Sequence, residues 1–230
     1  TELLIGEEGV EKLHNSKVIV FGIGGVGSFV VEALTRAGVG NLILVDNDTV
    51  CISNLNRQIH ATQATVESIK VEAMKARVLS INPNCNVEAK QEFITADNIQ
   101  EIIPEDIDYV VDAIDTVTSK LALAEYCYKN DIKLIASMGT GNKIDPTQFR
   151  VTDVFKTKVC PLAKVMRTEL RKRGVKKLKV VYSEEIPMVP NKGRAVPSKK
   201  RQTPGSISFV PPVAGMIIGG EVIKDLTGLN

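Results

Sequence analysis

Three glycines near the start of the chain have a spacing that suits the binding of a phosphate group. Gly22, Gly24 and Gly27 form a G-x-G-x-x-G pattern, directly after the apolar run at 18–21 and at the start of a helical pattern. Glycines in this context permit a tight turn and let backbone N–H groups approach a phosphate at the positive end of the helix. The pattern predicts a nucleotide site, and by itself it fits NAD as well as ATP.

Charged and amide side chains that follow the next strand-like segment favour ATP. Asp46 ends the segment NLILVD, where it is placed to accept hydrogen bonds from a ribose. Asn54, Arg57 and Gln58 follow in the loop DNDTVCISNLNRQIHA, and Lys70 comes shortly after them. NAD has two phosphates that backbone groups largely hold, whereas a triphosphate needs several side-chain cations and usually a metal. The cluster therefore indicates a triphosphate.

The elements that must position these residues alternate between strand and helix. Strand patterns fall at 18–21, 41–46, 85–90, 108–114 and 133–137. Helical patterns run from the glycines to residue 37 and over 64–80, 95–103 and 117–129, the third capped by Thr95 or Asp97. This alternation predicts an α/β fold, a Rossmann-like doubly wound and mostly parallel sheet. Ligands bind at the carboxyl ends of the strands in such sheets, which is where Asp112 and Asp115 fall.

The character of the chain changes beyond residue 141. Strands are expected at 147–154 and 177–183, a basic helix at 160–173, a mobile surface loop at 187–206 and an apolar helix at 211–225. The glycines of AGMIIGG in this last helix suggest close packing against the sheet or against a second subunit. We expect a single domain over 1–230, with an ATP-binding half at 1–141 and an elaborated basic half at 142–230 for substrate and dimer contacts.

Positive charge is concentrated in the C-terminal part. Between Lys156 and Arg201 there are fifteen Lys or Arg and three Glu, a net charge of +12 within a chain of net charge +2. Clustered Lys and Arg indicate a polyanionic partner, because they release counterions from nucleic-acid phosphates. A solvated basic helix face with a flexible loop is the alternative interpretation.

Other features narrow the class of protein. The sequence has no run of eighteen apolar residues and no basic region followed by an apolar stretch near its start, so a cytoplasmic protein is expected. Its four cysteines form no C-x-x-C pair, which argues against structural zinc and against a disulfide scaffold. Cys160 precedes the basic helix and could be a reactive thiol, although packing is the commoner use of a buried cysteine.

The segments GIGGVGS and DNDTVCISNLNRQ, then Lys70 and then DAIDT, resemble in this order the superfamily of ubiquitin-activating-type adenylating enzymes. This superfamily includes the bacterial activators of sulfur-carrier proteins, and the resemblance covers nearly the whole chain. It implies a fold that binds Mg-ATP. It also implies a reaction in which a substrate carboxylate attacks the α-phosphate to give an acyl adenylate and pyrophosphate.

The resemblance assigns roles to individual positions. Glycines line the phosphate path, Asp46 binds ribose, Asp115 binds Mg²⁺ and Asp48 assists. The catalytic residues implied are Arg57, Lys70 and Asp115. Arg57, Lys70 and the Mg²⁺ held by Asp115 would neutralise the negative charge that develops on the phosphates. The ATP-binding set implied is Gly22, Gly24, Gly25, Gly27, Asp46, Asp48, Asn54, Arg57, Gln58 and Lys70. Asp112 is a candidate for orienting or capping only.

One branch of the superfamily matches more closely. NLNRQIHA, INPNCNV, DAIDTVTSK, GTGNKIDPTQFRVTDVFKTKVCPLAK and the basic helix resemble the tRNA threonylcarbamoyladenosine dehydratases. In that branch ATP activates the threonyl carboxylate of a modified adenosine in the anticodon loop, and loss of AMP closes a ring. An internal nucleophile makes a protein thiol unnecessary, and tRNA needs a basic track. The candidate tRNA contacts are Lys164, Arg167, Arg171, Lys172, Arg173, Lys176 and Lys177.

Other functions and partners stay as alternatives or additions. Adenylation of the C-terminal glycine of a sulfur-carrier or ubiquitin-like protein is the alternative within the superfamily; an NAD-dependent dehydrogenase and a non-catalytic nucleotide-binding module belong to other classes. The resemblance also implies a homodimer, in which an Arg shortly before Gly6 reaches ATP in the partner subunit; the first Arg here is Arg36. The segment SMGTGNKIDP is a candidate for binding a monovalent cation, and sulfur-transfer proteins are candidate partners.

Overall fold

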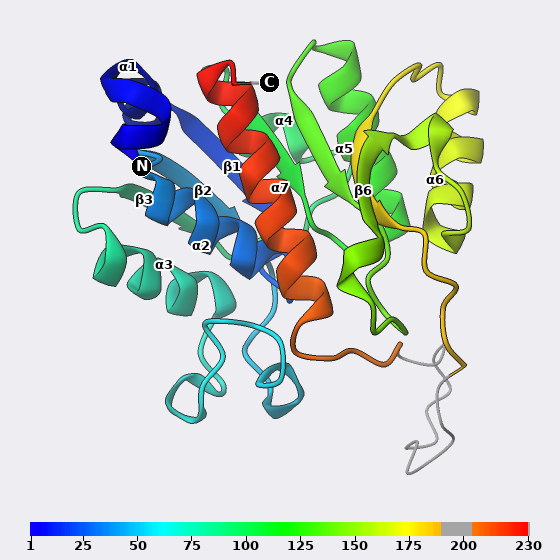
Figure 1. The fold of residues 1–230 in the computed structure, drawn as a ribbon, viewed down its shortest axis with the longest axis horizontal. Helices are drawn as coiled ribbons and strands as arrows, with labels where there is room; N and C mark the ends of the chain where they lie inside the picture. Colours follow the sequence, from blue (N-terminus) through cyan, green and yellow to red (C-terminus); the bar gives the residue numbers. More distant parts are fainter. Residues whose placement is uncertain (190–203, 230) are drawn as a thin grey trace.

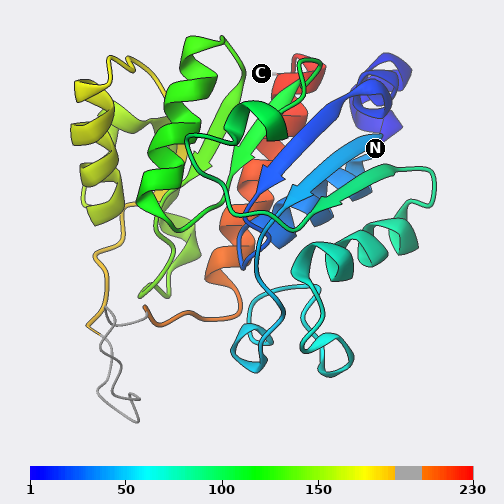
Figure 2. The ribbon, with the colours of Figure 1, turned by 180° about the vertical axis from the view of Figure 1, so that it is seen from behind.

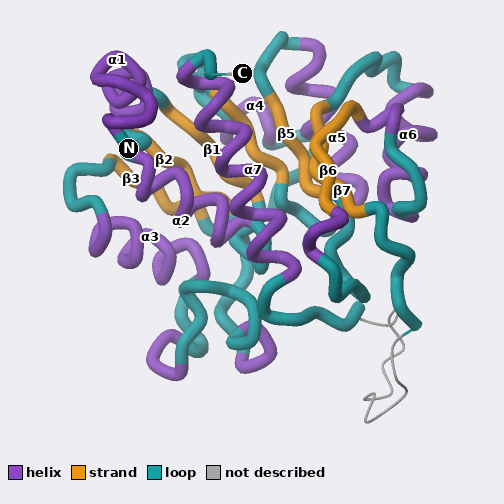
Figure 3. The backbone as a smooth tube through the Cα atoms, viewed as in Figure 1, coloured by secondary structure: helices purple, strands orange, loops and turns teal. Residues whose placement is uncertain are grey.

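A seven-stranded sheet forms the centre of the molecule (Figures 1 and 3). The computed structural model describes residues 1–189 and 204–229. The strand order is β3-β2-β1-β4-β5-β7-β6, and every neighbouring pair is parallel except β7 with β6. This confirms the predicted mostly parallel α/β sheet. The strands are β1 (Lys17–Phe21), β2 (Asn41–Val45), β3 (Asn86–Lys90), β4 (Tyr109–Asp112), β5 (Leu134–Ser137), β6 (Phe149–Asp153) and β7 (Lys179–Ser183).

Helices cover both faces of this sheet, as a doubly wound fold requires (Figures 1 and 2). One face carries α1 (Glu2–Asn15), α2 (Gly27–Ala37), α3 (Lys70–Ile81) and α7 (Val210–Thr227). The other carries α4 (Ile99–Ile102), α5 (Val117–Lys129) and α6 (Pro161–Lys172). Because both faces are covered, the inner strands are buried on both sides, which explains their continuous apolar runs.

The side chains of β1 show how the two halves of the core are divided. Val18 and Val20 belong to the apolar cluster shared with α2, α3 and α7. Ile19 and Phe21 belong to the cluster on the opposite face, with α4 and α5. The alternation follows from the two-residue period of a strand. It fixes the end of β1, and therefore the glycine turn that follows, relative to both helical layers.

Two glycines allow α7 to lie very close to α2. A Cβ atom added at Gly215 would come within 2.4 Å of the Val26 carbonyl oxygen, and one at Gly219 within 2.6 Å of the Ala33 Cβ. No larger residue fits at either position without moving α2. Close packing of these glycines was expected against the sheet or a second subunit, and at Gly215 and Gly219 the structure shows it against the helix α2.

The structure differs from the sequence-based expectations at three places. The helix α1 was not predicted, and it contains a non-helical residue, Gly6, with φ 72°. The helix expected at 64–80 begins only at Lys70, because residues 63–65 form a separate short turn and Glu67 adopts φ 72°. The helix expected at 95–103 is confined to the four residues of α4.

The loop expected at 187–206 lies largely outside the described residues.

Within the described ranges, none of the helices is both long enough and apolar enough to cross a bilayer.

Candidate nucleotide-binding site

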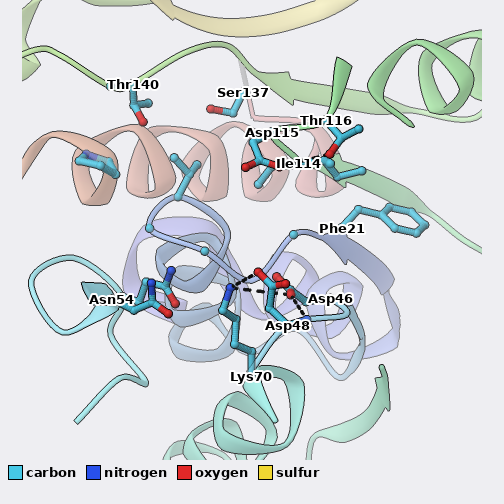
Figure 4. A pocket seen from close by; sticks show the side chains of 18 of the residues that line it. Phe21, Asp46, Asp48, Asn54, Lys70, Ile114, Asp115, Thr116, Ser137 and Thr140 are labelled. Atoms are coloured by element: carbon cyan, nitrogen blue, oxygen red, sulfur yellow. Dashed lines mark hydrogen bonds and ion pairs between the residues drawn. The ribbon is translucent and has the colours of Figure 1, made fainter. Parts of the chain in front are cut away.

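A cavity of about 570 Å³ opens at the carboxyl ends of β1 and β4, the point where the strand order reverses (Figure 4). In open α/β sheets this switch point is where ligands bind, and the volume is in the range of small-molecule sites. Ten of the eleven residues predicted to bind ATP or Mg²⁺ line it. They are Gly22, Gly24, Gly25, Asp46, Asp48, Asn54, Arg57, Gln58, Lys70 and Asp115.

Gly27 is the exception, because it lies beneath the glycine turn. A Cβ at Gly27 would come within 1.8 Å of the Gly22 carbonyl oxygen, so this glycine permits close packing of α2 on β1 and does not line the cavity. Gly22 has φ 85°, and a Cβ there would meet the Ala113 carbonyl oxygen at 2.7 Å. Helix α2 has no side-chain cap at Val26, so its first backbone N–H groups remain suited to an anion.

Asp46 links the glycine turn to the loop after β2. Its Oδ2 accepts a hydrogen bond from the Ile23 N–H at 2.7 Å, and its Oδ1 accepts one from the Asp48 N–H at 2.9 Å. Burial raises the pKa of Asp46, and the Lys70 charge opposes that rise. Each carboxylate oxygen keeps a second lone pair, so the group can still accept hydrogen bonds from ribose hydroxyls.

Lys70 is a buried cation at the first position of α3, with only 6% of its surface exposed. Its Nζ lies 2.8 Å from Asp48 Oδ2 and 3.9 Å from Asp46 Oδ1 (Figure 4). The Lys70 N–H also donates to the Asp48 carbonyl at 3.1 Å, which fixes the start of the helix. The ammonium is therefore held in place by carboxylates, and Asp48, whose side chain is 61% exposed, is the partner that a phosphate would displace.

Three side chains of the loop NLNRQ line the cavity, and two of them, Arg57 and Gln58, lie next to the glycine turn. Arg57 donates from Nη1 to the Ser53 carbonyl at 2.8 Å; among the described residues its hydrogen bonds leave Nε and Nη2 available for a phosphate. Asn54 caps its own short turn by accepting from the Cys51 N–H at 3.0 Å, which leaves its NH₂ group for a ligand. Gln58 is buried, and its Oε1 has no hydrogen-bond partner among the described atoms.

Asp115 lies across the cavity from Lys70 and Asp46 (Figure 4). It follows β4, it is exposed, and its Oδ1 accepts from the Thr116 hydroxyl at 3.4 Å. The described residues contain no group of three His, Cys, Asp or Glu that could hold a metal ion. A single free carboxylate beside a phosphate site still fits Mg²⁺, which is commonly held by one or two carboxylates, substrate phosphates and water.

Asp112 does not reach the cavity. It ends β4 with no exposed surface, and its Oδ2 lies 2.9 Å from Nζ of Lys120, which is equally buried. Burial raises the pKa of Asp112, and the Lys120 charge opposes it. The role of this pair is therefore indirect.

Further walls of the cavity come from segments that the sequence did not predict to bind the nucleotide, although 137–141 overlap the segment predicted to bind a monovalent cation. Residues 92–94 follow β3, residues 137–141 begin at the last residue of β5, and Leu162 comes from the first turn of α6. Ser119 fixes one of these walls by donating to the Ile94 carbonyl at 2.7 Å. The rule that ligands lie beyond the strand ends would have found the first two segments. No comparable signal marks Leu162.

The basic helix does not present all seven predicted tRNA contacts as free cations. Arg167 donates to the Thr157 carbonyl at 3.0 Å, and Arg171 lies 5.3 Å from the centre of the Phe155 ring. Ion pairs of 2.7 Å join Lys172 to Glu169 and Arg173 to Glu125. Arg167 is half-buried and its hydrogen bonds hold the turn at Thr157, so its role as a tRNA contact stays a prediction. Four of the seven are exposed and have no ion pair in the described part of the chain: Arg171, which lies against the Phe155 ring, and Lys164, Lys176 and Lys177.

Cys160 is buried at the start of α6, with 2% of its surface exposed, and it belongs to the apolar cluster between α5 and α6. It does not line the cavity. This placement fits the packing role better than a reactive thiol.

Fold and site together define a nucleotide-binding domain of the doubly wound α/β class. A sequence profile of the ThiF family matches residues 2–230. The chain is 49% identical to the tRNA threonylcarbamoyladenosine dehydratase of Bacillus subtilis, over 98% of this chain and 92% of that protein.

Solved structures agree with this likeness. The crystal structure of the Escherichia coli tRNA N6-threonylcarbamoyladenosine dehydratase in complex with AMP superposes with a TM-score of 0.91 at 36% identity, covering 99% of this chain and 92% of that one. The complex of the same enzyme with ATP gives a TM-score of 0.89 at 35% identity over the same shares. The chain belongs to the ThiF family, and within it to the tRNA threonylcarbamoyladenosine dehydratases.

Proposed function

We propose that this protein catalyses the ATP-dependent dehydration of threonylcarbamoyladenosine in tRNA. The observation that carries the proposal is the convergence of buried and half-buried phosphate-binding groups in one cavity at the switch point of the sheet. Relatives that share nearly the full length of the chain carry the name of this activity, and one of them was solved with ATP. Sulfur-carrier adenylation, the alternative, has no structural observation of its own in its favour.

The chemistry begins with transfer of an adenylyl group. A carboxylate oxygen of the threonyl group attacks the α-phosphorus of ATP, the bond from that phosphorus to the bridging oxygen breaks, and pyrophosphate leaves. A nucleophilic atom within the same modified side chain then attacks the activated acyl carbon and loses its proton. AMP departs with one of the original carboxylate oxygens. The modified nucleoside thereby loses the elements of one water.

The residues of the cavity have separate tasks in this reaction. The glycine turn and the start of α2 bind phosphate through backbone N–H groups. Asp46 binds the ribose, and Asn54 and Gln58 offer amide donors to the phosphates. Arg57 and Lys70 stabilise the charge that develops as the carboxylate approaches an already anionic phosphate. Asp48 releases Lys70 for that purpose.

Asp115 would hold Mg²⁺ in this proposal. When bound, the ion would supply a Lewis acid for the phosphate oxygens. The Asp115 carboxylate lies across the cavity from Lys70. A nucleotide between them would therefore have the Lys70 ammonium on one side and the bound Mg²⁺ on the other.

The proposal extends to the two halves of the chain and to its partners. Residues 1–141 supply most of the ATP-binding groups, and 142–230 bind tRNA through Lys164, Lys176 and Lys177.

We infer that the protein is cytoplasmic and forms a homodimer. Leu3 and Leu4 on α1 support a further contact surface, because 103% and 87% of their surfaces are exposed. Light scattering tests the dimer. A monovalent cation near 137–146 and binding to sulfur-transfer proteins rest on the resemblance alone.

The decisive test uses tRNA from a strain that lacks the activity. The protein is incubated with this tRNA, ATP and Mg²⁺, and the nucleosides are measured by mass spectrometry. A nucleoside lighter by one water, formed only when ATP is present, is the expected result. Folded protein that binds ATP and leaves the nucleoside mass unchanged would overturn the proposal. Pyrophosphate exchange that depends on a carrier protein and not on tRNA would favour the alternative.

A further inference from the structure

We propose that Lys120 is a positioning residue, which acts through Asp112 to hold the loop that carries Asp115. The inference rests on the proposed function, because it concerns the same cavity. Lys120 lies in the first turn of α5, and Asp112 is the last residue of β4. Neither residue lines the cavity, and both side chains have 0% exposed surface. The two residues therefore form a buried ion pair that lies next to the cavity without lining it.

A continuous series of contacts joins Lys120 to the loop at 113–116. Lys120 Nζ lies 2.9 Å from Asp112 Oδ2. The other oxygen, Oδ1, accepts a hydrogen bond from the backbone N–H of Ile114 at 3.1 Å. Ile114 immediately precedes Asp115 and itself lines the cavity. The lysine thus fixes the Asp112 carboxylate, and that carboxylate fixes the backbone from which Asp115 projects.

The same loop also contacts the end of β1 and the glycine turn that follows it. The Ala113 N–H donates to the Phe21 carbonyl at 2.8 Å, and the Ala113 carbonyl lies so close to Gly22 that a Cβ there would meet it at 2.7 Å. A displacement of the loop would therefore reach the phosphate-binding turn as well as Asp115. Two walls of the cavity depend on one buried ion pair.

A purely structural role is the competing explanation. Buried ion pairs contribute little net stability compared with apolar residues of similar size, whereas removal of one partner leaves an uncompensated buried charge. Single substitutions that remove either charge would therefore impair folding under both explanations. Double substitutions separate them, because they remove both charges together.

Two double variants differ in one hydrogen bond. Asp112→Asn with Lys120→Met removes both charges and keeps an amide oxygen that can accept from the Ile114 N–H. Asp112→Leu with Lys120→Met removes the charges and that acceptor. The single variant Lys120→Arg keeps the cation and serves as the conservative rescue. Lys179→Met is the control for loss of a paired lysine, because Lys179 pairs with carboxylates of Glu221 and Asp225 at a place remote from the cavity.

The experiment measures kcat and KM for ATP by AMP release, together with amide hydrogen exchange at residues 113–116. We expect the Leu-Met variant to lose about 100-fold in kcat, because a displacement of about 1 Å has this effect on positioned groups. Exchange at 113–116 should accelerate in this variant, and its KM for ATP should rise, because the displaced loop also contacts the phosphate-binding turn. The Asn-Met variant should retain more activity than the Leu-Met variant. Lys120→Arg should keep the slow exchange of the unmodified protein, and Lys179→Met should match the unmodified protein in kcat.

Several outcomes would overturn the proposal. A folded Leu-Met variant with unchanged kcat and unchanged exchange would show that the pair serves stability alone. Equal losses in Lys179→Met would show that general destabilisation explains the effect. If the unmodified protein releases no AMP with tRNA, the proposed function fails. Hydrogen exchange then still decides whether Lys120 positions the loop, because that readout needs no activity.

Discussion

Substitution of Lys70 by methionine tests the cationic wall of the cavity most sharply. The change keeps much of the side-chain volume of a residue that is 6% exposed, and it removes the ammonium that lies 2.8 Å from Asp48 and 3.9 Å from Asp46. Asp46 then loses the charge that opposes its burial, so the pKa of Asp46 should rise further. A nucleotide would meet two carboxylates with no cation between them.

The size of the effect follows from the position of the charge. Two unit charges about 4 Å apart interact with about 4 kcal/mol at an effective dielectric constant of about 20. Competition with the 61% exposed Asp48 carboxylate reduces this gain, since Lys70 must leave that partner. A loss of about 3 kcal/mol in transition-state stabilisation corresponds to a fall in kcat of roughly 100-fold.

Single-turnover AMP formation with saturating ATP and modified tRNA is the suitable assay, because it reports the chemical step. Lys75→Met, on the same helix, is the matched control and should retain full activity. Far-ultraviolet circular dichroism and thermal unfolding establish that both variants are folded. A folded Lys70→Met variant with unchanged kcat would refute the assignment of Lys70 to the phosphates.

Three further predictions follow from the structure. Asp115→Ala should abolish AMP release while thermal unfolding stays near that of the unmodified protein; full activity at ordinary Mg²⁺ concentrations would contradict its proposed role. Burial lowers the pKa of His60 to about 4, so its neutral form is favoured in the folded state and the unfolded state binds more protons between about pH 4 and 6.5. The free energy of unfolding should therefore fall by up to about 3 kcal/mol as pH decreases through this window. Urea titrations at several pH values should show that the free energy of unfolding depends less on pH in His60→Leu than in the unmodified protein. The same pH dependence in both proteins would contradict this reasoning. Replacement of Lys164, Lys176 and Lys177 by glutamate should weaken tRNA binding and lower its dependence on salt, without altering ATP affinity. Filter binding at several salt concentrations measures the tRNA affinity. An unchanged slope of log affinity against log salt concentration would place the tRNA contacts elsewhere.

Local patterns in the sequence were sufficient to predict the sheet and the place of the cavity, whereas the roles of individual site residues came from the family resemblance. The apolar runs at β1, β2 and β4 are buried on both faces, which makes them easy to recognise. The candidate binding residues Asp46 and Asp115 lie within three residues of the ends of β2 and β4. The cavity could thus be anticipated because a parallel sheet brings its strand ends to one edge.

Features that depend on tertiary contacts were not visible in the sequence. The start of α3 depends on the bridge between Thr49 and Ile69 and on the unusual backbone of Glu67. Arg167 was indistinguishable from its exposed neighbours until Thr157 was seen to accept its hydrogen bond. The ion pair between Lys120 and Asp112 joins residues eight apart, and only their complete burial gives it significance.

The central claim is that a carboxylate of the modified nucleoside attacks the α-phosphorus of ATP. Oxygen labelling tests it directly. The reaction is run with tRNA whose threonyl carboxylate carries ¹⁸O, and the AMP is measured by mass spectrometry. The account predicts that AMP acquires one labelled oxygen as the nucleoside loses one water. Unlabelled AMP with a dehydrated nucleoside, or label in pyrophosphate, would contradict it.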